Sequence, residues 1–141
     1  MSEFTQEQIW HVTRSFNRLK AAHNDFADEF YFILFERAPA VRAFFPDHIC
    51  DQSRKLEETL ELVVQNLPNL AVILQPILEM AERHVGYGAT PEHYEVVRVA
   101  LFDTIVQMTP FGLSEPEVQA WDLALQSICD LMVGHAYSLA S

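Results

Sequence analysis

Glycine, proline and positive charge are all scarce in this chain. With only 4 Gly and 7 Pro in 141 residues, there are too few turn residues for a small β-sandwich or barrel, and long helices are favoured instead. Lys and Arg total 9 against 20 acidic residues, which gives a formal charge of −11 and a surface that repels phosphate backbones. We therefore expect an all-α protein with no nucleic-acid partner.

Cysteine is also rare, and no long apolar run is present. Cys50 and Cys129 form no CxxC pair, and the N-terminus lacks the basic segment, apolar run and small-residue cleavage site of a signal peptide. Charged or strongly polar residues interrupt every apolar stretch before it reaches the roughly 20 residues of a membrane-spanning helix. The chain is thus expected in the reducing cytoplasm, with no membrane partner.

The remaining composition is that of one folded domain. Hydrophobic residues make up 50% of the chain and charged residues 21%, which is too apolar and too weakly charged for disorder. Residues 1–141 match the length of a single domain that buries a core without disulfides or a structural metal. We predict one domain, either a monomer or a weak homo-oligomer.

Helical periodicity recurs along the chain. Thr5, Thr90 and Ser114 each precede an apolar stretch with helical spacing, in the position of an N-cap residue. Further stretches run from about 24 to 38, from about 54 to 68 and from 70 to about 84, the last with an expected interruption at Pro76. No strand pattern competes with these helices.

Catalytic motifs that can be read from a sequence are missing. There is no phosphate-binding glycine loop, HExxH, GxSxG or paired-cysteine metal site. A helical protein with ten phenylalanines can fill its centre with its own side chains or with a flat apolar cofactor, and periodicity does not choose between them. A haem would require one neutral imidazole as iron ligand and polar donors for a bound gas.

Several segments carry a family resemblance. The most specific is residues 83–94 (RHVGYGATPEHY), supported by residues 30–35 (FYFILF), 38–45 (APAVRAFF) and 52–56 (QSRKL), and by Trp121. Over nearly its whole length the chain resembles the bacterial single-domain globins and the globin module of flavohaemoglobins. The resemblance implies a globin fold of about seven to eight helices around a pocket for haem b (Fe-protoporphyrin IX).

The same resemblance assigns the groups that face iron and gas. His84 would be the proximal ligand, since a neutral imidazole holds iron and leaves the sixth position open; an ordinary surface or core histidine is the alternative. The Tyr31 hydroxyl and the Gln52 amide would donate to the bound gas. For these two the alternatives are a plain core tyrosine and an exposed glutamine.

Apolar contacts to the cofactor are implied in the same way. Leu56 would form the wall beside the sixth coordination position, and Phe45 would pack on the porphyrin. Met80 and Val97 would also contact the cofactor, and Tyr94 would help to orient the imidazole of the proximal histidine. For the apolar residues, generic core packing is the alternative, and the two interpretations hardly differ.

The chain also departs from the family pattern. Flavohaemoglobins carry a late glutamate that hydrogen-bonds the proximal histidine, whereas alignment from Trp121 places Ala136 there, with His135 beside it. We therefore expect a less imidazolate-like ligand and weaker oxidative chemistry. The segment from 46 to 51 is short, and its His48 and Cys50 are expected to be solvated loop residues rather than alternative iron ligands.

The preferred functional hypothesis is a haem globin that binds dioxygen reversibly and tightly, and also NO and CO, for storage or scavenging. An enzymatic alternative is nitric oxide dioxygenation, which would need a separate reductase to return the iron to its ferrous state. A third alternative is gas sensing through a surface contact. No residue is assigned a certain catalytic role.

Overall fold

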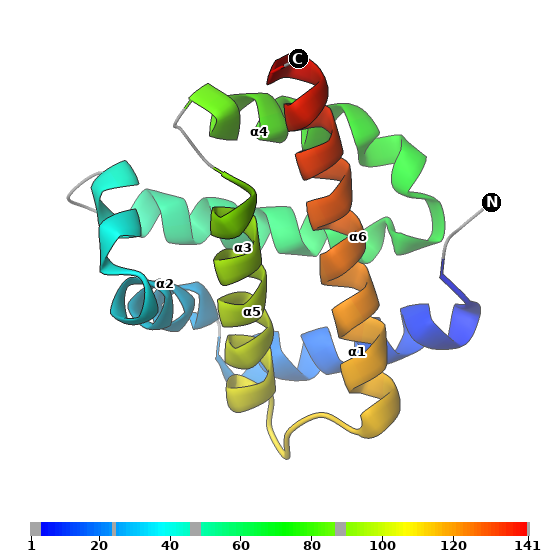
Figure 1. Cartoon of the computed structure of the whole chain (residues 1–141). Coiled ribbons are helices and arrows are strands. Elements are labelled where there is room, and N and C mark those ends of the chain that lie inside the picture. Colours follow the sequence, from blue (N-terminus) through cyan, green and yellow to red (C-terminus); the bar gives the residue numbers. More distant parts are fainter. Residues whose placement is uncertain (1–3, 24, 46–48, 87–89, 141) are drawn as a thin grey trace.

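The computed structural model describes residues 4–23, 25–45, 49–86 and 90–140, apart from the side chains of 85–86 and 136–140. Within these ranges the chain forms six α-helices and two 3₁₀ helices and no strand (Figure 1), which confirms the all-α prediction. In chain order they are α1 (Gln6–Ala22), α2 (Phe26–Arg37), η1 (Pro39–Phe44), α3 (Cys50–Gln65), η2 (Leu67–Ile73), α4 (Leu74–Gly86), α5 (Pro91–Met108) and α6 (Glu115–Ala140).

Three helices begin at the predicted N-caps. At the start of α1, Thr5 Oγ1 accepts a hydrogen bond from the Gln8 N–H at 3.1 Å, and Gln8 Oε1 accepts one from the Thr5 N–H at 2.9 Å. Thr90 caps α5 and Ser114 caps α6 in the same reciprocal way. These bonds satisfy backbone donors that have no partner within the helix, which fixes where each helix starts.

The predicted interruption at Pro76 was wrong. The chain departs from helical geometry earlier, at Asn69, where φ is −154° and ψ is 84°. Pro76 is the third residue of α4, where its missing N–H has no helical acceptor to lose.

In the described part of the chain, no single helix is long and apolar enough to cross a membrane. Only a bent pair, residues 50–65 and 67–84 at 118° to each other, passes the same test of length and composition.

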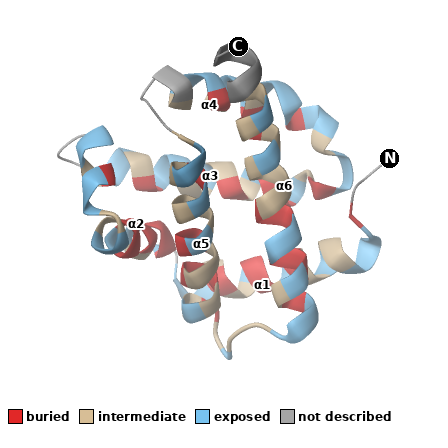
Figure 2. Ribbon diagram, in the orientation of Figure 1, coloured by how far each residue is buried: buried red, intermediate tan, exposed pale blue. Residues whose placement is uncertain are grey.

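The region around Trp121, called the closed half below, packs side chains of α1, the first turn of α2 and the first turns of α6 against each other, with Phe16 in ring contact with Phe26 and Trp121 at centroid distances of 6.1 Å. Trp121 is 1% exposed, and its indole N–H donates to Ser15 Oγ at 2.7 Å. Nearby, Arg18 donates to Glu117 Oε2 at 2.9 Å and to the Gly112 carbonyl at 3.1 Å, which ties α1 to the corner between α5 and α6. Figure 2 shows buried residues concentrated on the helix faces that meet here.

Candidate functional site

The other half of the molecule holds a cavity of about 350 Å³ between α2, η1, α3, α4 and α5. This volume lies at the lower end of the range of about 300–1,000 Å³ for ligand and cofactor pockets. Every residue predicted to contact cofactor or gas lines the cavity except Tyr94. Its lining consists of Phe30, Tyr31, Leu34, Val41, Phe44, Phe45, Gln52, Lys55, Leu56, Thr59, Met80, Arg83, His84, His93 and Val97.

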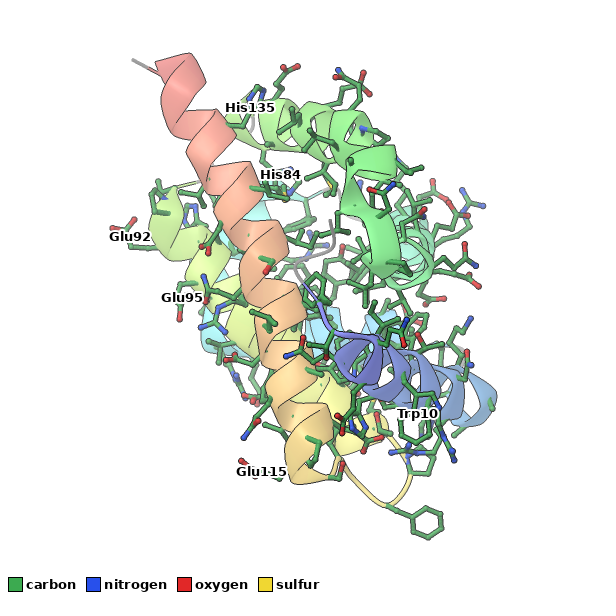
Figure 3. All side chains as sticks on the ribbon, turned by 90° about the vertical axis from the view of Figure 1, so that its right-hand side faces the viewer. Trp10, His84, Glu92, Glu95, Glu115 and His135 are labelled. Carbon is green, nitrogen blue, oxygen red and sulfur yellow. The ribbon has the colours of Figure 1, made fainter. Side chains whose placement is uncertain are left out.

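His84 comes from the last turn of α4, and its ring is directed into the molecule rather than outward (Figure 3). Its Nδ1 lies 2.7 Å from the Met80 carbonyl oxygen. Because a carbonyl can only accept, Nδ1 carries the proton. Burial lowers the pKa of His84, and the positive charge of Arg83 lowers it further. The hydrogen bond to the Met80 carbonyl acts in the opposite direction, but the net shift is downward. The ring is therefore neutral near pH 7 and carries its lone pair on Nε2, as a metal ligand requires.

Tyr94 of α5 lies beside this imidazole. Its ring centroid lies 5.9 Å from that of His84, with 32° between the two planes. Its hydroxyl is buried and has no hydrogen-bond partner among the described residues. Ala136, the position aligned with the family glutamate, lies where side chains are not described. Tyr94 thus contacts the His84 ring through its own ring, outside the cavity lining.

Tyr31 reaches the cavity from α2 and is only 6% exposed. Its ring is held by contacts with Phe30, Phe35 and Phe45 at centroid distances of 4.9, 5.8 and 5.5 Å. Burial raises the pKa of its hydroxyl to about 12, so the hydroxyl stays protonated at neutral pH. Among the described residues its acceptor is the Gln52 backbone carbonyl at 3.5 Å, a long bond that a better acceptor could replace.

One face of α3 forms a further wall of the cavity. Gln52, Lys55, Leu56 and Thr59 follow the spacing i, i+3, i+4 and i+7, which puts them on the same side of the helix. The Gln52 side-chain amide makes no hydrogen bond within the described residues, so its N–H groups can serve a ligand. Leu56 adds an apolar surface one turn further along.

The charge of the cavity is opposite to that of the chain. Lys55 and Arg83 both line it, and no aspartate or glutamate of the described residues does, although the chain has 20 acidic and 9 basic residues. Sequence reasoning missed both cations, together with His93, which contacts the Phe44 ring at a centroid distance of 5.2 Å. The cavity therefore suits an apolar ligand that also carries anionic groups.

Comparison with known proteins identifies the fold family. The family model described as Globin matches residues 28–132. The chain belongs to the globin family. This globin is 26% identical to a flavohemoprotein of Vibrio cholerae over 123 residues, which cover 85% of the chain but only 31% of that protein. The chain thus spans about a third of the length of such flavohemoproteins. It is also 27% identical to an anaerobic nitrite reductase of Oryza sativa subsp. indica, with 88% of each chain covered.

Solved structures share the same fold as this globin. A bacterial globin from Campylobacter jejuni superimposes with a TM-score of 0.84 at 25% identity, covering 96% of this chain and 99% of the other. Ferric myoglobin from Aplysia limacina gives a TM-score of 0.73 at 20% identity, covering 95% and 99% of the two chains. The globin fold predicted from the sequence is therefore confirmed.

The residues around the cavity fit the haem that membership of this family implies. No group of three or more His, Cys, Asp or Glu side chains in the described ranges could hold a bare metal ion. An iron porphyrin needs no such group, because the macrocycle supplies four nitrogens and the protein one imidazole. The aromatic and aliphatic lining suits the porphyrin plane, and Lys55 and Arg83 suit its two carboxylates. Globins bind diatomic ligands.

Proposed function

We propose that this globin holds haem b through His84 and binds dioxygen reversibly and tightly, and also NO and CO, in a storage or scavenging role. When bound, haem supplies an iron whose open sixth coordination position takes a diatomic gas. The observation that carries the proposal is the combination, in one cavity, of a neutral imidazole with a fixed tautomer and a tyrosine hydroxyl that stays protonated.

The cavity residues would divide the remaining tasks among them. Phe45, Leu56, Met80 and Val97 supply apolar surface that packs on the porphyrin and keeps water from it. Lys55 and Arg83 would pair with the carboxylates at its edge. Both cations are exposed, so they would meet these carboxylates where the cavity opens to solvent.

Tyr31 and Gln52 would control the affinity for the gas. A hydrogen bond to a charged or polarised group contributes about 1.5–3 kcal/mol, and each 1.4 kcal/mol changes an equilibrium about tenfold. The Tyr31 hydroxyl would exchange its long bond to the Gln52 carbonyl for a shorter one to the ligand. Loss of this donor is therefore expected to release dioxygen about ten to a hundred times faster.

The test is the oxygen dissociation rate of Tyr31→Phe, measured by stopped flow in the reduced, haem-loaded protein. Phe32→Leu serves as the matched control, because Phe32 is the next residue of α2 and is 62% exposed. We expect a large increase for Tyr31→Phe and none for Phe32→Leu. An unchanged rate in Tyr31→Phe would remove the role assigned to this hydroxyl.

Nitric oxide dioxygenation is a second candidate, supported by the likeness to flavohemoproteins over 85% of the chain. The reaction joins nitric oxide, dioxygen and one electron to give nitrate, so a separate electron donor has to act in each cycle. Tyr31 and Gln52 would also serve this reaction as hydrogen-bond donors to the bound gas. The two functions are separated by measuring nitrate formation from nitric oxide in air, with a candidate reductase as electron donor. A storage role predicts no sustained turnover.

A further inference from the structure

A hydrogen-bonded pair links the helix that carries His84 to the last helix. His135 of α6 donates from Nε2 to Glu82 Oε1 of α4 at 3.0 Å, and the two side chains are 24% and 50% exposed. Because a carboxylate only accepts, the Nε2 of His135 carries a proton in either charge state of the ring. Helices α4 and α6 also form the most extensive helix pairing of the described structure. Figure 3 shows His84 and His135 at the same end of the molecule.

We propose that the Glu82–His135 pair positions the His84 imidazole and would thereby influence how strongly this imidazole binds the haem iron. The proposal rests on the proposed function of His84 as ligand. Glu82 lies two residues before His84, and α4 ends at Gly86. The last turns of a helix lack hydrogen-bond partners for their carbonyls and open easily unless another element holds them. The pair supplies such a tie from α6.

The tie acts on the bond that fixes the tautomer of His84. That bond runs from Nδ1 to the Met80 carbonyl, so it exists only while the turn between residues 80 and 84 is helical. Opening of the turn would allow the ring to rotate and to exchange its proton between the two nitrogens. Neither Glu82 nor His135 lines the cavity, so both are positioning residues that act through the helix.

The contact with Tyr94 does not make this tie redundant. Tyr94 approaches His84 ring to ring, and its hydroxyl reaches no acceptor in the described part of the chain. Ring contact limits where the imidazole can lie, but it specifies no tautomer. A tautomer is specified by the Met80 carbonyl, and the Glu82–His135 pair preserves the geometry that brings this carbonyl to the ring.

The experiment compares variants that remove the pair with variants that keep it. His135→Ala and Glu82→Ala remove it, whereas His135→Gln and Glu82→Gln each retain a donor or an acceptor. Lys20→Met is the matched control, since it breaks an equally short pair, Lys20–Glu61 at 2.9 Å, between α1 and α3. In hemin-free protein, amide exchange of residues 80–84 and the nitrogen chemical shifts of the His84 ring are measured. In the hemin-loaded ferrous protein, the iron–imidazole stretching frequency is measured.

We expect exchange of the 80–84 amides about two to five times faster in both alanine variants, the range for a partly exposed pair. We also expect mixed tautomer signals of His84 and a shifted or broadened stretching band. In the glutamine variants, amide exchange, tautomer signals and stretching band should be close to those of the unaltered protein. The double variant Glu82→Ala/His135→Ala should change these quantities no more than either single alanine variant does.

The proposal is overturned if the alanine variants match the control, or if exchange accelerates while the tautomer and the stretching band stay unchanged. The second result would make the pair purely structural. Failure of the proposed function looks different: the unaltered protein would take up no hemin and give no stretching band. The tautomer measurement in hemin-free protein would still decide whether the pair orients His84.

Discussion

The buried indole of Trp121 and the buried hydroxyl of Tyr31 satisfy their hydrogen bonds in different ways. Around Trp121 the bonds are short: the indole donates to Ser15 at 2.7 Å, and Ser15 donates to the His11 carbonyl at 2.7 Å. On the cavity wall two donors differ: His84 Nδ1 lies 2.7 Å from the Met80 carbonyl, whereas the Tyr31 hydroxyl lies 3.5 Å from its acceptor. A protein stabilises itself where its polar groups are paired and keeps donors in reserve where it binds.

The largest effect is expected from His84→Ala. Removal of the proposed imidazole ligand should abolish coordination of iron by the protein, while the hemin-free protein should keep its fold, because the closed half is untouched. The absorption spectrum of the hemin-loaded variant, with and without added imidazole, measures the first effect, and chemical unfolding of the hemin-free form measures the second. A Soret band identical to that of the unaltered protein would contradict the assignment.

Trp121→Ala should do the reverse. Truncation of a buried tryptophan leaves a cavity and removes the partner of Ser15, which should lower the free energy of unfolding by about 3–5 kcal/mol. Chemical denaturation of the hemin-free protein measures this change. The matched control is Trp10→Ala, since Trp10 is 52% exposed and should change stability far less. Equal losses in both variants would contradict the assignment of Trp121 to the core.

Glu117 should make the closed half sensitive to acid. Its hydrogen bond with Arg18 lowers the pKa of this carboxyl below its usual 4.5, so the folded state holds its proton less tightly than the unfolded state does. The stabilisation is therefore present above the unfolded pKa of about 4.5 and is lost as pH falls through the lower folded value. Glu117→Gln should flatten the stability profile below about pH 5. Unfolding midpoints between pH 3 and pH 7 test this.

The smallest effect is expected from Tyr94→Phe. The substitution removes a buried hydroxyl that has no partner among the described residues, so stability should change by less than about 0.5 kcal/mol, or even rise. The ring that contacts His84 is retained, and the iron–imidazole stretching frequency should stay constant. A large shift of that band would mean that the hydroxyl does bond to a partner once haem is present.

The sequence predicted the helix starts well because the caps are local. Thr5, Thr90 and Ser114 bond to residues three positions away, so their patterns are visible in a single chain. Pro76 misled because a proline in the first turn of a helix and one in its interior have the same immediate appearance. The two cases are distinguished by where the preceding segment bends. The sequence around Asn69 did not indicate that the bend lies there.

The site was predicted only in part, for a related reason. His84, Tyr31 and Gln52 stand in segments similar to a known family, and the structure brings all three to one cavity. Lys55 belongs to a charged helix face that is typical of solvent exposure and is exposed as expected, but its place on the cavity edge depends on the packing of α3 against its neighbours. The prediction for His48 lies outside the described residues.

The bond between His84 and Met80 has a consequence for how this protein can change over evolution. Its acceptor is a main-chain oxygen, so no exchange of the side chain at position 80 deletes it while the helix persists. The Met80 side chain meanwhile lines the cavity. One position thus keeps the orientation of the imidazole constant and leaves the shape of the pocket open to variation, which would allow ligand preference to change without loss of the proposed iron ligand.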